Sequence, residues 1–284
     1  MKKFKSLFIS VMVLVTAVVA TTILAGCTKY EFTEAVALRA EDQELEEYAF
    51  AVQKGNTEML DKLNAFFSLD STKELIEKSM DYHTGVSQEK PIKASVLNDN
   101  TGAEITMVTE AGFAPYEYEG GGEGAVNQVV GLDVDLMIAF AEANNFKLKL
   151  LNTEFNSVIP EVAKSKMSIG AAGITVTEKR KEQVDFANPY IKTIQYIVSD
   201  KANSYKTIDQ LAGFKVGFQA STTGQFVIED FNTAVAEGEI DAKEIVEKSY
   251  GKVMAAYQDL KKGKIAAIVI DEYVAIGLVE NDKK

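Results

Sequence analysis

From Glu104 onward, the pattern of apolar and polar residues changes repeatedly between two periods. Short runs such as EITMVTE, FKLKLL and IAAIVID predict strands, whereas GLDVDLMIAFAEANN and KVMAAYQDLKKG place apolar residues at helical spacing. Regular alternation of strands and helices predicts parallel sheets that helices cover. Two such series follow one another, and each has the size of a small domain. We therefore expect an α/β protein of two lobes with a cleft between them.

The part of the chain before Glu104 has a different pattern. EYAFAVQ alternates with period two and predicts a strand, after which Asn56 caps an amphipathic helix. A second short helix is expected over residues 71–80. Residues 83–103 are polar, contain one proline and two glycines, and show no periodicity, which indicates a linker. We interpret His83, in this polar stretch, as a solvated linker residue.

Residues 1–27 have the pattern of a targeting segment. Three lysines precede the apolar run LFISVMVLVTAVVATTILA, and the run ends in LAGC at Cys27. Small residues before a cysteine resemble a lipobox, which implies cleavage before Cys27 and a lipid on its sulfur. The alternative is an uncleaved anchor, because the run is nearly long enough to cross a bilayer. Because the chain has no other cysteine, we favour a lipoprotein outside the cytoplasmic membrane and tethered to it.

Composition excludes several classes of function. Hydrophobic residues make up 46% of the chain and charged residues 25%, so ordinary cores can form. Without the three lysines of the leader, 27 basic residues face 42 acidic ones, which argues against nucleic acid or an anionic membrane surface as partner. One histidine and one cysteine leave little room for Ser-His-Asp, Cys-His or zinc chemistry. We expect no disulfide within the mature chain, no metal and no cofactor.

Four predicted strand ends carry polar or aromatic residues, at the edge where open α/β sheets bind ligands. Their sequences are TEAGFAPYEYE followed by GLDVDL, GAAGITVTEKRKEQVDFANPY, FQASTTGQF and IVIDEYVA. In spacing and type they resemble the extracellular amino-acid-binding proteins that supply ABC transporters. The resemblance covers the chain after Cys27 apart from the linker. It implies a two-lobe, type II periplasmic-binding-protein fold in which helices flank a mainly parallel sheet in each lobe.

The resemblance implies that the ligand's α-carboxylate is held from both lobes. Arg180 lies in the first turn of a helix that Thr177 caps, and its planar fork can bind a carboxylate with two hydrogen bonds. On the other lobe, unpaired amides of Thr222 and Thr223 at a helix start would bind the same group. Ser221 stands where the family usually has glycine, so the close backbone approach there is expected to be looser.

The α-ammonium group has its own implied partners. Asp271 ends an apolar strand, and with the Thr175 hydroxyl and the Gly173 carbonyl it is expected to take the ammonium. The alternative for Asp271 is a plain N-cap of the following helix. We interpret Lys179 and Lys181, beside the arginine, as solvated side chains.

The remaining implied contacts concern the ligand's side chain. Phe113 and Phe155 would form apolar walls on either side of it. Glu110 follows the first strand of lobe 1 and would favour basic or polar side chains, although it could equally be a solvated loop residue. Asp133 and Asp135 stand at a helix start, where we expect them to complement the helix dipole and cap amides, without a ligand role.

EYAFAVQKGNTEMLDKLNAFF resembles the closing segment of this family, yet it lies near the start of this chain. Joining Lys284 to Lys29 restores the family order, so we interpret the protein as a circular permutant cut within lobe 2. The alternative is that residues 28–82 form an unrelated helical stub. The expected organisation is a signal peptide at 1–27, a lobe 2 strand within 28–45, lobe 1 at 46–82 and 104–194, a linker at 83–103, and lobe 2 at 195–284.

These features together predict a lipid-anchored extracellular receptor. We expect it to bind a free amino acid with a polar or basic side chain and to deliver it to the permease subunits of an ABC importer by hinge closure. The protein is expected to be a monomer and not an enzyme. One alternative is a dehydratase-like enzyme of the same fold that acts on a small carboxylic acid, with Glu110 as its acid. Another is a ligand-sensing subunit that works with a separate signalling protein.

Overall fold

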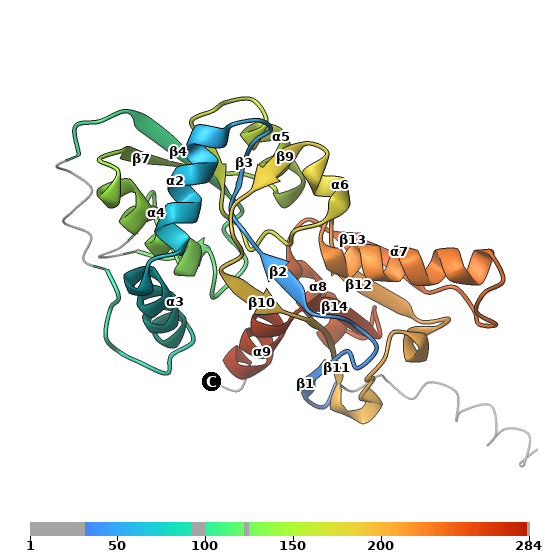
Figure 1. The fold of residues 1–284 in the computed structure, drawn as a ribbon. Coiled ribbons are helices and arrows are strands. Elements are labelled where there is room, and N and C mark those ends of the chain that lie inside the picture. The colour runs from blue at the N-terminus through green and yellow to red at the C-terminus, as the bar shows by residue number, and fades with distance from the viewer. Residues whose placement is uncertain (1–31, 93–99, 122–124, 283–284) are drawn as a thin grey trace, which may run out of the picture. The chain divides into compact units, whose positions relative to one another are not determined.

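Two five-stranded sheets organise the part of the chain that the computed structural model describes, which is residues 32–92, 100–121 and 125–282 (Figure 1). The first sheet, in lobe 1, has the order β7 (Lys147–Asn152), β4 (Glu104–Thr109), β8 (Ser168–Gly170), β3 (Ala51–Gln53) and β9 (Val184–Phe186). The second sheet, in lobe 2, has the order β1 (Ala35–Arg39), β11 (Gln195–Asp200), β14 (Ala267–Asp271), β12 (Lys215–Gln219) and β13 (Val246–Tyr250). The expected two-lobe α/β fold is confirmed, with mixed sheets.

Lobe 1 is built around the parallel strands β4, β7 and β8, and β3 pairs antiparallel with both β8 and β9. Helix α5 (Phe155–Val162) packs on this sheet, and its Val158 and Val162 meet Val108, Ile174 and Val184 in one core. Helices α4 (Leu132–Ala143), α2 (Thr57–Phe67) and α3 (Asp70–His83) also belong to lobe 1, as does a hairpin of β5 (Tyr118–Glu119) and β6 (Val129–Val130).

Lobe 2 has the same layered plan. Strand β12 runs parallel to β13 and β14, whereas β11 pairs antiparallel with β14 and with β1. Helices α7 (Thr223–Ala236), α8 (Val253–Lys261) and α9 (Glu272–Asn281) pack on this sheet. The core contains Ile197, Phe218, Ile228, Phe231 and Val269. In both lobes, ligand-type residues at the carboxyl ends of the parallel strands therefore lie where helices begin.

Two crossings of the chain connect the lobes. Strand β2 (Glu46–Tyr48) leads from lobe 2 to lobe 1 and pairs antiparallel with β10 (Ile191–Thr193), which leads back (Figure 1). EYAFAVQ, predicted as one strand, is thus divided between this crossing pair and β3. Backbone hydrogen bonds continue across the division, because Ala49 N–H donates to the Ile174 carbonyl at 3.1 Å and Ala187 N–H donates to the Phe50 carbonyl at 2.9 Å. The strand prediction holds for both pieces, but residues 48–52 are all buried instead of alternating, and the two pieces belong to different sheets.

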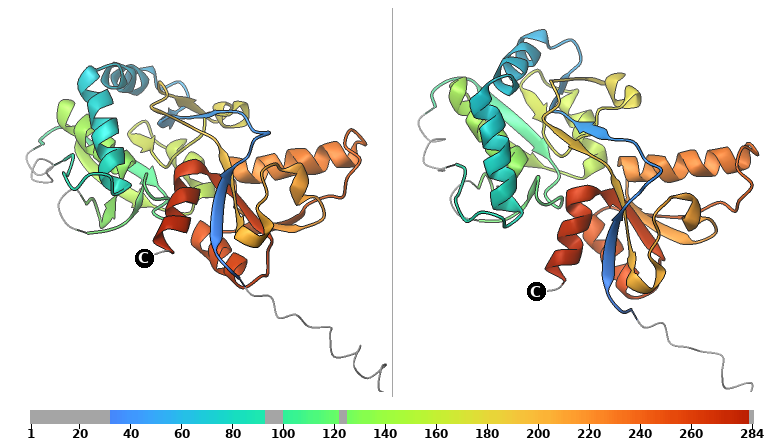
Figure 2. Two further views of the ribbon diagram at one scale, coloured as in Figure 1. Left: turned by 90° about the horizontal axis from the view of Figure 1, so that it is seen from below. Right: turned by 60° about the horizontal axis from the view of Figure 1, so that its bottom comes forward.

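The N-terminal segment contributes to both sheets. Strand β1 pairs with β11 in lobe 2, with Ala35 opposite Asp200, whereas β3 lies between β8 and β9 in lobe 1. Helix α9, late in the chain, packs against β1 (Figure 2). Residues 1–31, which include Cys27 and the predicted signal peptide, lie outside the described residues. Among the helices of residues 32–92, 100–121 and 125–282, none combines the length and apolar character needed to cross a membrane.

Lobe 2 also contains a short 3₁₀ turn. TIDQLAG forms only the single 3₁₀ turn η3 (Asp209–Leu211). Gly213 follows with φ of +79°, a left-handed conformation that ends the turn before a helix can develop. Leu211, the last residue of the turn, is buried in the core of lobe 2.

Candidate functional site

Side chains from both lobes converge on one narrow space. Its lining contains Phe113, Phe155, Gly173, Thr175 and Arg180 from lobe 1 and Gln219, Thr222, Thr223 and Asp271 from lobe 2. Every predicted ligand-binding residue except Glu110 is in this set, and Gln219 is an addition. Only about 10 Å³ remains between them, which is close to the minimum for one water molecule. A larger ligand can enter only if the lobes move apart.

Arg180 is held in this space by its own helix and by the opposite lobe. It lies on the short helix α6 (Glu178–Lys181), where the Thr177 hydroxyl accepts a hydrogen bond from its N–H at 3.2 Å. Its buried guanidinium donates to the carbonyl of Thr175 at 2.7 Å and to that of Ser221, across the cleft, at 3.0 Å. Burial lowers the pKa of Arg180, whereas the carboxylate of Asp271 opposes that shift. Arginine keeps its charge even so, and a buried cation needs an anionic partner.

Aromatic rings frame this guanidinium. Its Cζ lies 5.3 Å from the ring centre of Phe155 and 5.9 Å from that of Phe226, a lobe 2 residue that the sequence did not single out. Lys179 is exposed as expected, but its Nζ lies 5.0 Å from the same Phe226 ring, so it also touches the opposite lobe. Lys181 is exposed and pairs with Glu178 at 2.7 Å. Both lysines are thus exposed, as expected, and Lys179 in addition contacts a ring of the opposite lobe.

The backbone at Gly173 leaves no room for a side chain. Its φ is +53°, and a Cβ there would come within 2.9 Å of the Phe113 ring and 3.2 Å of the Tyr48 ring. The Gly173 N–H donates to Asp133 Oδ2 at 3.0 Å, and Tyr190 donates its hydroxyl to the other oxygen of Asp133. The expectation that Asp133 caps its own helix is therefore wrong, since its carboxylate positions the glycine instead. Burial raises the pKa of Asp133 to about 6, while these two hydrogen bonds oppose the rise.

The turn before α7 differs from the expectation in one detail. Ser221 has φ of +65°, the left-handed conformation that favours glycine, and accepts the bond from Arg180. Thr222 donates both its hydroxyl, at 2.8 Å, and its N–H, at 3.4 Å, to the Gln219 carbonyl. The prediction that the Thr222 amide has no partner is therefore wrong. Thr223 is the first residue of α7, and amides at that position have no intrahelical acceptor.

Asp271 is buried at the end of β14. It occupies the N-cap position of α9, but its side chain makes no capping hydrogen bond. Gln195 donates to it from β11 at 3.1 Å. Burial, followed by the nearby Glu46 carboxylate, raises the pKa of Asp271 to about 7, while Arg180 opposes the rise. The carboxylate thus faces the cleft instead of capping its helix.

Glu46, on the crossing strand β2, was not identified from the sequence. Its Oε2 accepts hydrogen bonds from the hydroxyls of Thr175 and Thr223, both at 2.8 Å, and its Oε1 accepts one from Gln195 at 2.9 Å. Thr175 belongs to lobe 1 and Thr223 to lobe 2, so one carboxylate bonds to both sides. The EEY sequence carries no signal for this role, because only the crossing of the chain brings Glu46 to the cleft.

Glu110 lies beside this space and contacts lobe 2. Gln219 donates to its Oε2 at 3.0 Å, and the Lys252 ammonium lies 3.5 Å from its Oε1. Burial raises the pKa of Glu110. Oε1 of Glu110 and Oε1 of Gln219 are both buried and accept no hydrogen bond. The alternative of a solvated loop residue is wrong, because only 1% of Glu110 is exposed.

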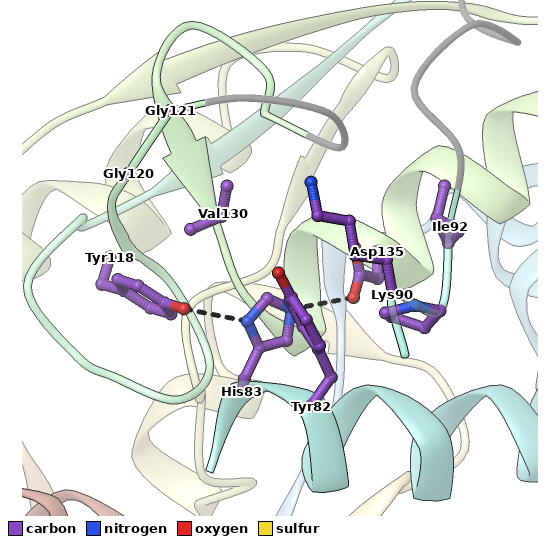
Figure 3. Close-up of a pocket in the computed structure, with 10 residues that line it drawn as sticks. Tyr82, His83, Lys90, Ile92, Tyr118, Gly120, Gly121, Val130 and Asp135 are labelled. Carbon is purple, nitrogen blue, oxygen red and sulfur yellow. Dashed lines mark hydrogen bonds and ion pairs between the residues drawn. The ribbon is translucent and has the colours of Figure 1, made fainter. Parts of the chain in front are cut away.

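A second polar cavity, of about 180 Å³, lies in lobe 1 beside His83 (Figure 3). His83 is the last residue of α3, and its ring lies between the Tyr118 hydroxyl at 3.0 Å and Asp135 Oδ2 at 2.9 Å. Ser79 donates to the same Asp135 oxygen at 2.6 Å. The interpretation of His83 as a solvated linker residue is wrong, because its side chain is only 3% exposed. Asp135 lies in the first turn of α4, as expected, but its side chain bonds to Ser79 and His83 instead of capping an amide of that helix.

Metal binding finds no support in the described residues. Within 32–92, 100–121 and 125–282, no group of three or more histidine, cysteine, aspartate or glutamate side chains is arranged to hold an ion. The charged groups of the cleft are bonded to hydroxyls, amides and carbonyls. The arrangement is therefore suited to binding a small polar molecule that carries both signs of charge.

Comparisons with known proteins point in the same direction. Residues 105–269 match the family described as bacterial extracellular solute-binding proteins, family 3. A probable histidine-binding protein of Neisseria gonorrhoeae is 29% identical over 184 residues, which is 64% of each chain. The ABC transporter arginine-binding protein 1 of Escherichia coli (strain K12) is 29% identical over 171 residues, 60% of this chain and 64% of its own. The matches thus span less than two thirds of these relatives.

The same similarity holds for solved structures. An ancestral arginine-binding protein bound to arginine is 32% identical, with a TM-score of 0.56, over 65% of this chain and 76% of that one. The ancestral arginine-binding protein bound to glutamine gives a TM-score of 0.55 at 32% identity, over 64% and 75% of the two chains. The family match covers more than half of the chain, and the fold and the cleft residues agree with it. The chain belongs to the bacterial extracellular solute-binding proteins, family 3.

Proposed function

We propose that this protein binds a free amino acid between its two lobes and supplies it to an ABC importer. The observation that carries the proposal is the pair of opposite charges in one cleft, because Arg180 of lobe 1 and Asp271 of lobe 2 are both buried and line the same space. Within the described residues neither side chain forms a salt bridge, and buried charges of this kind call for a ligand with both signs of charge. An α-carboxylate fits Arg180, and an α-ammonium group fits Asp271.

The cleft also favours a side chain that donates hydrogen bonds. Glu110 and Gln219 are joined by a hydrogen bond, and each has a buried Oε1 that accepts no hydrogen bond. A guanidinium, ammonium or amide group of the ligand could donate to these atoms, in competition with Lys252 at Glu110. The relatives described above are named as histidine-binding or arginine-binding proteins. The ancestral arginine-binding protein has solved structures with arginine and with glutamine bound. We therefore propose a basic or amide side chain. Phe113 and Phe155 would contact its apolar part.

Binding requires movement of the lobes about β2 and β10. The closed cleft has almost no free volume, and direct contacts such as Arg180 to Ser221 and Gln219 to Glu110 cross it. A ligand would replace these contacts with its own and draw the lobes together again, as in other two-lobe receptors. Permease subunits would then recognise the closed form.

We also propose that the chain is circularly permuted and lipid-anchored. Strands β1 and β3 precede the family match in sequence, yet they complete the two sheets, and α9 packs against β1. A rearranged chain that runs 104–284 and then 29–82 should fold and bind as the natural order does. Loss of folding in the rearranged chain alone would contradict the permutation. For the anchor, Cys27→Ser should abolish lipid labelling, and unchanged labelling would refute it.

Thermal-shift screening against the standard amino acids, ornithine and citrulline tests the binding function. A ligand at 100 times its Kd should stabilise the protein by ~2.7 kcal/mol, enough for a clear shift. Mass spectrometry of the bound and released molecule then separates a receptor from a dehydratase-like enzyme. We expect the same molecule to be recovered intact, whereas loss of water would favour the enzyme. Absence of a shift with every compound would contradict amino-acid binding.

A further inference from the structure

The crossing strand β2 brings a second carboxylate, that of Glu46, to the ammonium end of the cleft. Its three hydrogen-bond donors come from three different parts of the chain. Thr175 lies in lobe 1, Thr223 begins the first helix turn of α7, and Gln195 opens β11. Through Gln195 the network continues to Asp271, since the same amide nitrogen lies 3.1 Å from Asp271 Oδ1.

These hydrogen bonds determine whether the two threonine hydroxyls can donate to a ligand or only accept from it. A hydroxyl has a single proton to donate and two lone pairs that accept. Thr175 and Thr223 both give their proton to Glu46. Towards the cleft they can then only accept, so they suit an ammonium donor and not a carboxylate. Without Glu46, each hydroxyl could turn its proton to the ligand's carboxylate instead.

The charges around this end of the cleft are unequal. Glu46 and Asp271 are acidic, Arg180 is the one cation that contributes to the pKa of Asp271, and the phenols of Tyr48 and Tyr116 lie close to Asp271. With both acids ionised, acidic groups outnumber basic ones by two to one. An α-ammonium group would restore the balance, whereas a neutral hydroxyl or oxo group in its place would not.

We propose that Glu46 is a positioning residue of the amino-acid site: it aligns the Thr175 and Thr223 hydroxyls as acceptors and adds a second negative charge for the ligand's α-ammonium group. The inference rests on the proposed function, because it concerns the same ligand. The proposed role of Glu46 also predicts which class of ligand the site selects. Amino acids should bind much better than the 2-hydroxy or 2-oxo acids with the same side chain.

Glu46→Gln tests the role with the smallest change in shape, and Glu47→Gln is its matched control. Glu47 is the next residue on β2 and loses the same charge, but its side chain is 45% exposed and pairs with Lys192 at 3.3 Å. Calorimetric titration of the best amino acid from the screen should be carried out between pH 5.5 and 8.5. At pH 8, we expect Glu46→Gln to bind about tenfold more weakly than the parent, which corresponds to ~1.4 kcal/mol. Glu47→Gln should bind as the parent does.

The pH profile separates this role from a purely structural one. Glu46 raises the pKa of Asp271, and binding of the ammonium group requires ionised Asp271. Loss of the Glu46 charge should therefore lower the pKa of Asp271. The fall in affinity at acid pH should then begin at a lower pH than in the parent. The advantage of the amino acid over the matching 2-hydroxy acid should also shrink by about tenfold.

The outcomes are decisive in each case. Parental affinity and an unshifted pH profile in Glu46→Gln would overturn the inference, whereas failure of the parent to bind any amino acid would overturn the proposed function. If Glu46→Gln does not fold, Glu46→Asp keeps the charge but is too short to reach both hydroxyls. It should keep the parental pH profile and lose at least threefold in affinity, and unchanged affinity would overturn the inference.

Discussion

The cleft between the lobes and the cavity beside His83 are both lined by buried polar side chains, but those side chains are satisfied differently. Beside His83, both ring nitrogens have partners within lobe 1, and Asp135 accepts from His83 and Ser79 (Figure 3). In and beside the cleft, buried oxygens of Gln195, Gln219 and Glu110 accept no hydrogen bond, and the Glu110 oxygen has only the Lys252 ammonium, 3.5 Å away, as an ion-pair partner among the described residues. Buried polar atoms are paired in most proteins, so a group of unpaired ones indicates a ligand site. The cleft is suited to binding, and the His83 network to stability.

The largest effect is expected for the two opposite charges of the cleft. Arg180→Ala and Asp271→Asn each leave the ligand's opposite charge desolvated and without a partner, a loss that typically amounts to ~2–5 kcal/mol. Affinity for the cognate amino acid should fall by about thirtyfold to several thousandfold, measured by calorimetric titration.

Lys181→Ala provides the control for these variants. It removes a cation from the same short helix, but Lys181 is exposed and pairs with Glu178 on that helix instead of lining the cleft. Its affinity should equal that of the parent. If Arg180→Ala also binds like the parent while folded, the assignment of the carboxylate to Arg180 is wrong.

The opposite behaviour is expected for the cavity beside His83. Asp135→Ala leaves His83 and the Ser79 hydroxyl without their shared acceptor, at ~1–3 kcal/mol for each buried group. The free energy of unfolding in urea should fall by ~2–6 kcal/mol, with unchanged affinity in the folded protein. Glu77→Ala, an exposed carboxylate on α3, should change stability by less than ~0.5 kcal/mol. If Asp135→Ala lost as much affinity as Asp271→Asn, the cavity beside His83 would also take part in binding, and the two regions would not differ in role.

The pH dependence of binding should follow Asp271. Its pKa in the ligand-free cleft is raised to about 7, and the ammonium group binds the ionised form. Affinity should therefore fall about tenfold between pH 8 and pH 6, and Asp271→Asn should bind weakly with a nearly flat profile. Calorimetric titration at several pH values gives the profile, and proton release on binding at pH 7 should accompany it. A parental profile that is flat over this range would contradict ammonium binding to Asp271.

The ligand-free protein should show the reverse dependence. A carboxyl group whose pKa is raised by folding binds more protons in the folded state than in the unfolded state. Its contribution to stability therefore rises as pH falls through about 7, and Asp133, with a pKa of about 6, acts in the same direction. The stabilisation that the ligand adds in a thermal melt should consequently be larger at pH 8 than at pH 6.

The smallest effect is expected at the side-chain end of the cleft. Lys252 lies 3.5 Å from Glu110 and is 45% exposed, so it competes only moderately with a cationic ligand side chain. Lys252→Met should raise affinity for basic amino acids by about threefold relative to amide ones, because the competing charge is gone. Lys262→Met, an exposed lysine after α8, is the control. An equal change in affinity for basic and amide ligands would show that Glu110 does not select between their side chains.

Much of the fold could be predicted from the chain because it depends on local patterns. The apolar periods identified the strand β4, the helix α4 and the strand β14 close to their observed bounds. The predicted site residues that line the cleft stand at strand ends or helix starts. A strand end places a side chain at a known edge of a sheet, whatever the rest of the protein does. Thr177 and Arg180 are only three residues apart, so their geometry is also local.

What the sequence by itself determined is therefore the order of strands and helices and the residues at their ends. Only the tertiary structure decided which of these side chains meet. Glu46 reaches the cleft because β2 crosses between the lobes, and His83 is buried because α3 ends against Asp135, which lies 52 residues away in the chain. The number of hydrogen bonds a group makes depends on such distant partners, which no periodic pattern encodes. Local patterns report which face is buried, whereas the pairing of charges and donors inside it is set by the packing of distant segments.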